Sequence, residues 1–301
     1  QAIPPVLMMK DIIGIAQTGT GKTASFVLPM IDILAHGRSR ARMPRSLILE
    51  PTRELAMQVD RQLEGFSFHM NASSIPIYGG RDGHSMAQEQ KALKTGAPIV
   101  VATPGRLMAH LDMGYTDLSE VRHLVLDEAD RMLDMGFIPD VEKIVAMLSP
   151  MRTTLLFSAT MPKEIRRLAE KFLSNPKEIS VSPPASTADT IVQGLIKLRA
   201  TSKAAGAAQK VKRDALRDLI EKQTDISNAL VFCNRKRDVD VVFKSLEKHG
   251  LSVARLHGDM AQSLRTETLE KFKKNEATIL VCSDVAARGL DISTVSHVFN
   301  F

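Results

Sequence analysis

The stretch from Ala16 to Thr23 constrains the fold of this chain more than any other feature. It follows an apolar run at residues 12–15 and precedes a segment whose apolar residues recur at helical spacing. A strand, a glycine-rich turn and a helix in that order form a phosphate cradle, because backbone N–H groups and the positive helix end face the anion. Lys22 is expected to reach the β- and γ-phosphates, and the Thr23 hydroxyl to bind Mg²⁺. The alternative is a flexible turn that contains Gly-Lys-Thr by chance. The residues expected to hold the nucleotide are Ala16, Gln17, Thr18, Gly19, Thr20, Gly21, Lys22 and Thr23.

Length and composition place the chain among ordinary globular proteins. Its 301 residues are 44% hydrophobic, which predicts two domains with filled cores. No apolar run approaches the roughly 20 residues needed to cross a bilayer, so no membrane partner is expected. Cys233 and Cys282 lie in apolar, strand-like runs. We therefore expect packed core cysteines in a reducing cytoplasm rather than a disulfide framework or a metal site.

Strand-like runs alternate with polar turns and helical patterns along the whole chain. This order predicts an α/β fold with mostly parallel sheets flanked by helices on both faces, and ligands at the carboxyl ends of the strands. The expected strands are residues 12–15, 46–49, 99–102, 123–126 and 154–157, then 229–233, 252–256, 279–282 and 295–299. The main expected helices are residues 54–63, 163–173, 239–247 and 262–272.

A short Pro-bearing stretch divides the chain. We predict one domain at residues 1–182, a linker at 183–189 and a second domain at 190–301, which looks incomplete because no helix follows its last strand. Residues 200–208 are predicted to form a loop, although their alanine content could instead extend a helix. The net charge of +6 is uneven: residues from 183 onward carry 19 Lys and Arg against 14 Asp and Glu. That excess favours a polyanionic partner, although solubility alone would also explain it.

Two acids end the expected strand at residues 123–126. Asp127 can hold Mg²⁺ on the nucleotide phosphates, and Glu128 can orient or deprotonate a water for in-line attack. Neighbouring acids of this kind favour hydrolysis over transfer to a bound small molecule. The alternative is a solvated acidic turn.

These motifs resemble those of the DEAD-box RNA helicases, whose name residues 127–130 match. The other matches follow in that family's order over essentially the whole chain, and the resemblance is greatest to the bacterial RhlE-type members. The further matching motifs are Pro51-Thr52-Arg53-Glu54-Leu55-Ala56, Gly79-Gly80, Thr103-Pro104-Gly105-Arg106, Ser158-Ala159-Thr160, Val231 to Arg235, His257-Gly258-Asp259 with Gln262 and Arg265, and Asp284 to Asp291.

The resemblance implies two RecA-like P-loop domains with ATP and Mg²⁺ in a cleft and RNA across both. It implies that Gln1 reads adenine, although a frayed end is the alternative, and that Asp291 contacts the ribose. Ser158, Ala159 and Thr160 would couple hydrolysis to strand separation, the two hydroxyls by bonding the carboxylates after Asp127; alternatively these hydroxyls merely cap the next helix. The implied RNA contacts are Pro51, Thr52, Arg53, Gly79, Gly80, Thr103, Pro104, Gly105, Arg106, Arg235, Arg265, Ser283 and Asp284. As alternatives, Arg53 could be a surface helix residue and Thr103 a helix cap.

The resemblance also implies the activity, an ATP-dependent RNA helicase of the cytoplasm that unwinds short duplexes or remodels RNA–protein complexes. Aromatic residues make up only 4%, which favours a grip on the RNA backbone that tolerates any sequence. Partners in ribosome assembly or RNA decay are further expectations. Because the family's upstream aromatic and final arginine motif are missing, we expect weak hydrolysis by these 301 residues. The competing hypotheses are a P-loop ATPase acting on protein or small-molecule cargo, and a non-catalytic ATP- and RNA-binding clamp.

Overall fold

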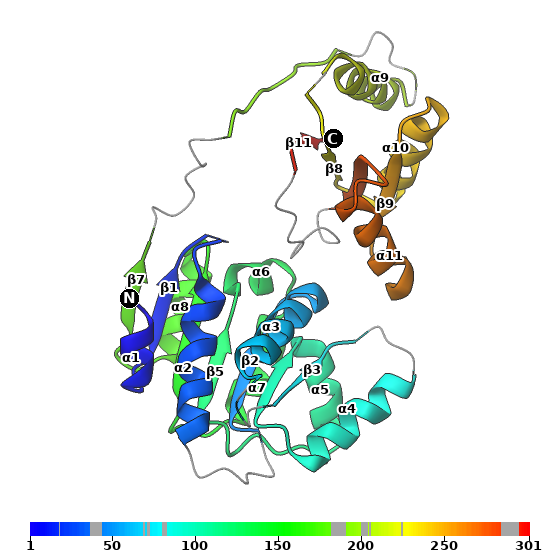
Figure 1. Ribbon diagram of the computed structural model, residues 1–301. Helices are drawn as coiled ribbons and strands as arrows, with labels where there is room; N and C mark the ends of the chain where they lie inside the picture. Colours follow the sequence, from blue (N-terminus) through cyan, green and yellow to red (C-terminus); the bar gives the residue numbers. More distant parts are fainter. Residues whose placement is uncertain are drawn as a thin grey trace. The chain divides into compact units, whose positions relative to one another are not determined.

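The structure is a computed structural model with two compact units, residues 1–189 and 190–301 (Figure 1). It describes residues 1–17, 19–36, 44–68, 70, 73–79, 83–181, 191–199, 204, 206–223, 225–283 and 295–301. The expected linker at 183–189 therefore lies outside the described residues. None of the described helices combines the length and the apolar character that crossing a bilayer requires.

The first unit is built on a sheet of seven parallel strands in the order β3-β4-β2-β5-β6-β1-β7. The five strands expected in this unit are present. β3 and β7 were not expected, because these edge strands bury only some of their residues and lack a continuous apolar run. The strands are β1 (Ile12–Ile15), β2 (Ser46–Leu49), β3 (Ser74–Ile77), β4 (Ile99–Ala102), β5 (His123–Leu126), β6 (Thr153–Ser158) and β7 (Lys177–Ser180).

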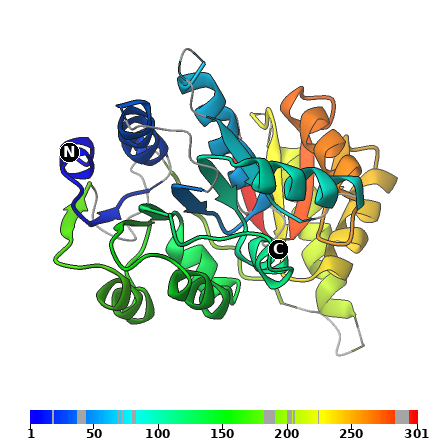
Figure 2. The ribbon, with the colours of Figure 1, turned by 90° about the horizontal axis from the view of Figure 1, so that it is seen from below.

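Helices cover both faces of this sheet, as predicted, and Figure 2 shows helices on either side of β1. One core packs α1 to α3 on the sheet and the other packs α4 to α8, with alternate strand residues pointing into each. The helices are α1 (Ile3–Leu7), α2 (Lys22–His36), α3 (Arg53–Phe66), α4 (Gly83–Thr95), α5 (Pro104–Asp112), α6 (Ala129–Asp134), α7 (Ile138–Ala146) and α8 (Lys163–Phe172).

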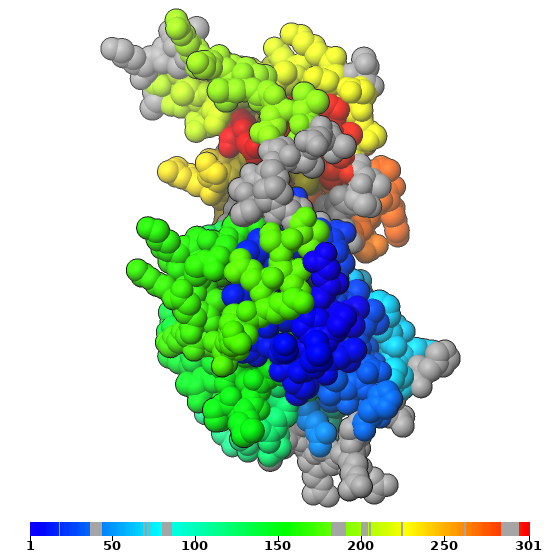
Figure 3. Space-filling view, turned by 90° about the vertical axis from the view of Figure 1, so that its left-hand side faces the viewer, coloured from blue at the N-terminus to red at the C-terminus, as the bar shows by residue number. Residues whose placement is uncertain are grey.

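The ring of Phe157 lies directly against Gly14 of β1. This residue is in register with Phe157 of β6 and Ile179 of β7. A Cβ at Gly14 would lie 2.4 Å from a carbon of the Phe157 ring, so no other residue fits without displacing the ring. The N-terminal residues lie against β7, which Figure 3 shows as dark blue beside green.

The second unit has a sheet of four parallel strands in the order β11-β8-β10-β9. All four expected strands are present, the last shifted by about two residues. Helix α9 was not expected: it begins at Ala207, inside the predicted loop, and packs Leu216 and Ile220 into the core at helical spacing. The elements are β8 (Ala229–Cys233), β9 (Val253–Leu256), β10 (Ile279–Ser283), β11 (His297–Asn300), α9 (Ala207–Lys222), α10 (Lys236–Lys248) and α11 (Gln262–Lys273).

Both cysteines are free and buried in the core of the second unit, as the apolar runs around them predicted. Burial raises the pKa of the Cys233 thiol to about 12, with a smaller contribution from Asp238. At neutral pH this thiol therefore keeps its proton and behaves as an apolar core group.

Candidate active site

The predicted phosphate cradle has the expected strand, turn and helix. β1 ends at Ile15, and the next amide, that of Ala16, donates to the Ser158 carbonyl oxygen at 3.1 Å. Gly19 and Gly21 have φ of +81° and +82°, a conformation that side chains other than glycine rarely adopt. Helix α2 begins immediately afterwards, so its first N–H groups are available for an anion. Thr18 lies outside the described residues.

Lys22 is the first residue of α2, and its ammonium nitrogen is buried without a hydrogen-bond partner among the described residues. The ammonium is close enough to the carboxyls of Asp127, Glu128 and Glu50 for its charge to lower their pKa values. A buried ammonium without hydrogen bonds is costly, and phosphate oxygens are the acceptors that would satisfy it. The residues present therefore fit a nucleoside triphosphate.

A cavity of about 160 Å³ adjoins the cradle. Gly14, Phe157, Ile179 and Val181 provide apolar walls, and Gln1 lies at the cavity together with residues of the turn. Apolar walls with one side-chain amide suit a flat heterocyclic base, because the amide can both donate and accept hydrogen bonds. Gln1 is exposed, but its position at this cavity agrees with the expected contact to a base.

Asp127 and Glu128 follow β5 and are both buried. Burial raises the pKa of Asp127 to about 6, against the opposing charge of Lys22. Glu128 has a left-handed backbone, with φ of +50°, and burial likewise raises the pKa of its carboxyl. Its Oε2 lies 3.0 Å from Nη1 of Arg131 without hydrogen-bond alignment, so the contact is an ion pair. Strain at such a residue is often found in functional sites.

Glu50 is a third acid at this end of the sheet that sequence reasoning missed. It directly follows β2, whose register with β5 places it beside Asp127. It is fully buried, and neither carboxylate oxygen has a hydrogen-bond partner among the described residues. Burial, then the charges of Asp127 and Glu128, raise the pKa of Glu50 well above its ordinary value. Its position at the carboxyl end of a predicted strand could have indicated a site residue, but only the order of strands in the sheet shows that it lies beside Asp127.

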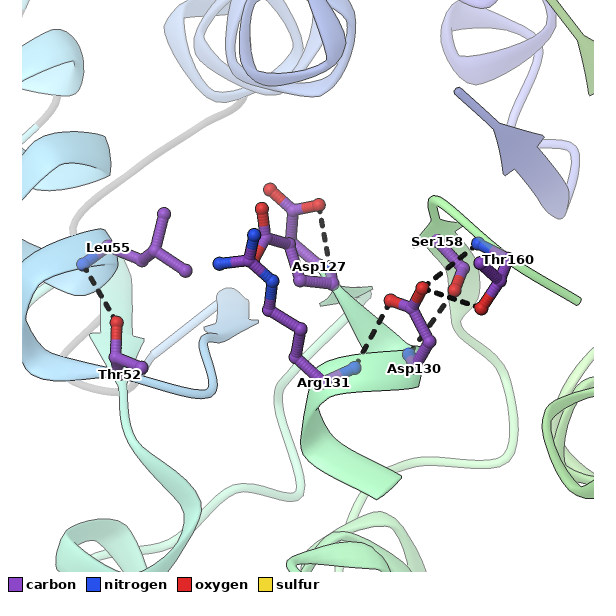
Figure 4. A network of polar contacts seen from close by, with 8 residues as sticks. Thr52, Leu55, Asp127, Asp130, Arg131, Ser158 and Thr160 are labelled. Atoms are coloured by element: carbon purple, nitrogen blue, oxygen red, sulfur yellow. Dashed lines mark hydrogen bonds and ion pairs between the residues drawn. The ribbon is translucent and has the colours of Figure 1, made fainter. Parts of the chain in front are cut away.

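Ser158 and Thr160 contact Asp130 in the way that Figure 4 shows. The Thr160 hydroxyl and amide both donate to Oδ2 of Asp130, at 2.8 and 2.9 Å. Ser158 differs from the expectation, because its hydroxyl accepts the Asp130 amide at 3.2 Å rather than bonding a carboxylate. The next helix, α8, has Pro162 as its N-cap, so neither hydroxyl caps it. Ala159 lies between the two hydroxyl residues.

A second group of predicted residues gathers at Gly79, which follows β3. A Cβ at Gly79 would lie 3.7 Å from Nη2 of Arg53 and 3.9 Å from Cδ of Arg106, so these side chains are neighbours. We call Arg53 and Arg106 the arginine pair. The Thr52 hydroxyl accepts the Leu55 amide as the cap of α3, and Thr103 is the N-cap residue of α5 without a side-chain capping bond. Pro51 is buried, Pro104 and Gly105 open α5, and Gly80 lies outside the described residues.

Arg106 has a partner that the sequence did not reveal. Its Nε donates to Oε2 of Glu89, on α4, at 2.8 Å. The same oxygen lies 2.8 Å from Nε2 of His110, which is fully buried. The guanidinium is thus held from one side, while its Nη2 has no hydrogen-bond partner among the described residues.

The second unit carries a basic cavity of about 530 Å³ at the carboxyl end of β8. Arg235 lines it together with Lys212, Arg213 and Arg237, and Asp238 is the one acid among the lining residues. Lys212 and Arg213 come from α9, a helix that sequence reasoning missed. Elsewhere in this unit, Arg265 is partly buried on α11 and Ser283 is buried at the end of β10. Asp284 and Asp291 lie outside the described residues.

The fold and the cradle define a nucleotide-binding protein of the P-loop class. Residues 1–168 match the DEAD/DEAH box helicase family, and residues 211–301 match the helicase conserved C-terminal domain. This chain belongs to the DEAD/DEAH box helicase family.

Comparison with known proteins gives the same result. The chain is 42% identical over 302 residues to the DEAD-box ATP-dependent RNA helicase CshA of Bacillus cereus, covering 100% of this chain and 54% of that protein. It is also 42% identical to the ATP-dependent RNA helicase CshA of Listeria monocytogenes, covering 100% of this chain and 55% of that protein. The chain thus spans about half the length of these curated relatives. Because these relatives are CshA helicases, the expected kinship with RhlE-type members is not supported.

Two solved structures resemble the fold. A DEAD box protein from the hyperthermophile Methanococcus jannaschii is 37% identical, with a TM-score of 0.55, covering 99% of this chain and 76% of that one. Yeast Dbp5, solved bound to Gle1 and IP6, is 27% identical, with a TM-score of 0.69, covering 100% of this chain and 73% of that one.

Proposed function

We propose that this chain forms the two-domain core of an ATP-dependent RNA helicase. The observation that carries the proposal is the buried ammonium of Lys22, which has no hydrogen-bond partner among the described residues and faces the acids at the ends of β2 and β5. Family membership and the names of the relatives support RNA as the polymer. A cytoplasmic location and partners in ribosome assembly or RNA decay are further parts of the proposal.

Nucleotide binding would use one end of the first sheet. The backbone N–H groups from Gly19 to Lys22 would bind phosphate oxygens, and Gln1 would bond the base edge. Thr23 and Asp127 would hold Mg²⁺, which neutralises charge on the phosphates when bound. Glu128 would orient or deprotonate the attacking water, and its raised pKa suits a base that works near neutral pH. Arg131 would keep the Glu128 carboxylate in place through the ion pair.

RNA binding would use the arginine pair in the first unit and the basic cavity in the second. Guanidinium groups bind phosphates without reading bases, which agrees with a grip that tolerates any sequence. We propose that nucleotide brings the two units together on the strand and that hydrolysis releases it. Within the first unit, Asp130 links the acid pair to Thr160, so a change at Asp127 and Glu128 would reach the segment just after β6 through two hydrogen bonds.

Binding of a fluorescent single-stranded RNA, with and without a non-hydrolysable ATP analogue and Mg²⁺, tests the proposal. We expect the analogue to tighten RNA binding, and the substitution Lys22→Ala to remove that gain. RNA affinity that ignores the analogue in the unaltered chain would refute the proposal. Nucleotide-dependent binding by a protein that never turns over ATP would instead support the non-catalytic clamp.

A further inference from the structure

A buried polar cluster lies behind the arginine pair. Glu89 of α4 is 5% exposed, and its Oε2 accepts from both Arg106 and His110 of α5, each at 2.8 Å. Arg106 and His110 are four residues apart, so they stand on the same face of α5, one turn apart. A single carboxylate oxygen therefore ties two successive turns of this helix to α4.

The proton on His110 follows from its other partner. Nδ1 of His110 makes a short contact with the Tyr115 hydroxyl. Burial, and then the charge of Glu89, raise the pKa of the Tyr115 phenol, so the phenol keeps its proton and can donate it. A phenol that donates to Nδ1 leaves the imidazole proton on Nε2, where it bonds Glu89. The chain of contacts from Tyr115 through His110 thus fixes the Glu89 carboxylate.

The guanidinium of Arg106 is hydrogen-bonded at one nitrogen and lacks a hydrogen-bond partner at another. Nη2 of Arg106 is buried and has no hydrogen bond among the described residues, whereas Nε is bonded to Glu89. The side chain passes Gly79, where Arg53 also approaches. An arginine pinned at Nε keeps the fork of its two terminal nitrogens in one orientation, which suits bidentate contact with a phosphate.

We propose that Glu89 is a positioning residue for RNA binding, which holds Arg106 so that its guanidinium fork meets an RNA phosphate. The inference rests on the proposed function, because it assigns the contact to RNA. The charge of Glu89 makes the proposal testable. A carboxylate near a phosphate site repels RNA through its field, so only its hold on Arg106 favours binding.

Two conservative substitutions separate the effect of the length of the Glu89 side chain from the effect of its charge. Glu89→Asp keeps the charge but withdraws the carboxylate by one methylene, so Arg106 is released. Glu89→Gln keeps the acceptor oxygen at the same reach but removes the charge. We expect Glu89→Asp to weaken binding of single-stranded RNA about tenfold and Glu89→Gln to stay within about threefold of the unaltered chain. A purely electrostatic role predicts tighter binding for Glu89→Gln and no change for Glu89→Asp.

A double-mutant cycle with Arg106→Ala decides the result. If Glu89 acts through Arg106, Glu89→Asp costs nothing further once Arg106→Ala is present. The dependence of log affinity on log salt should also fall by about 0.7 for Glu89→Asp, as for Arg106→Ala, because one phosphate contact is lost. Losses that add fully, or an unchanged salt slope, would overturn the inference. Affinity for the ATP analogue reports the folding of the first unit and should not change.

The controls separate this inference from the proposed function. If the unaltered chain bound no RNA with or without the analogue, the proposed function would fail. If the unaltered chain bound RNA and Arg106→Ala left that affinity intact, the positioning role would fail and the proposed function would stand.

Discussion

Two regions of the first unit handle buried charge in opposite ways. At the nucleotide end, Lys22 and Glu50 are buried, and among the described residues neither the ammonium nor the carboxylate has a hydrogen-bond partner. At the arginine pair, Arg106 is bonded through Nε to Glu89, which is also bonded to His110, and Nη2 of the same guanidinium is left without a partner among the described residues. Buried charges that make no hydrogen bond within the described residues mark the end that a ligand completes. Charges already bonded within the protein mark a surface whose geometry is set before any ligand arrives.

Loss of the buried ammonium should have the largest effect. Lys22→Ala removes the buried ammonium whose charge acts on all three acids at the nucleotide end, so we expect affinity for an ATP analogue with Mg²⁺ to fall by roughly 100-fold. RNA affinity without nucleotide should be unchanged, because the arginine pair is untouched. Isothermal titration calorimetry measures the first quantity and fluorescence anisotropy the second. Lys10→Ala, an exposed lysine of the same unit, is the matched control. Retained nucleotide affinity in Lys22→Ala would break the contrast between the two regions.

A larger side chain at position 79 should disturb the arginine pair and leave the nucleotide end unchanged. A leucine side chain there would displace Arg53 and Arg106, so we expect Gly79→Leu to weaken RNA binding about tenfold and to leave nucleotide affinity unchanged. Gly79→Ala is the matched control, because its Cβ would meet both arginines at ordinary contact distances of 3.7 and 3.9 Å. Equal RNA affinities for all three proteins would show that the arginine pair does not contact the strand.

The buried carboxylate of Asp127 at the nucleotide end should also lower the free energy of unfolding of the protein without nucleotide. Burial raises the pKa of Asp127 from 3.8 to about 6. The native state therefore binds the proton more tightly than the unfolded chain does. This contribution to stability is complete below pH 4 and is lost as the pH rises through 6. Asp127→Asn should therefore raise the free energy of unfolding at pH 8 by about 3 kcal/mol and change it little at pH 4. Urea denaturation at both pH values measures this difference, with Asp112→Asn, at an exposed aspartate, as control. A stabilisation of equal size at both pH values would contradict the assigned pKa.

The smallest effect concerns the link between the acid pair and Thr160, just after β6. Thr160→Val removes one of the two hydrogen bonds that this residue donates to Asp130, and the amide bond remains. We expect a loss of about 1 kcal/mol in the free energy of unfolding and a reduced stimulation of ATP hydrolysis by RNA. Thr95→Val is the control, because its hydroxyl bonds only a nearby helix carbonyl. If stability fell while RNA stimulation stayed intact, Thr160 would be a structural residue and not a coupling one.

Much of this site could be predicted from local patterns in the sequence. The cradle from Ala16 to Thr23 is contiguous, so spacing and flanking periodicity identify it without any knowledge of the fold. The same is true of Asp127 and Glu128, which end an uninterrupted apolar run, and of the central strands, which are buried on both faces. Edge strands β3 and β7 escaped prediction because few of their residues are buried, and α9 escaped because its core face consists mainly of Leu216 and Ile220.

The class of fold and the phosphate site follow from local patterns, because both depend on residues close together along the chain. Which charges meet depends instead on how the strands and helices pack. Glu50 lies beside Asp127 only because β2 and β5 are adjacent in the sheet, 77 residues apart in sequence. Glu89 reaches Arg106 only because α4 packs beside α5 on one face. The physical reason is that burial and pairing of charge depend on neighbours across strands and helices, and no local pattern encodes those neighbours.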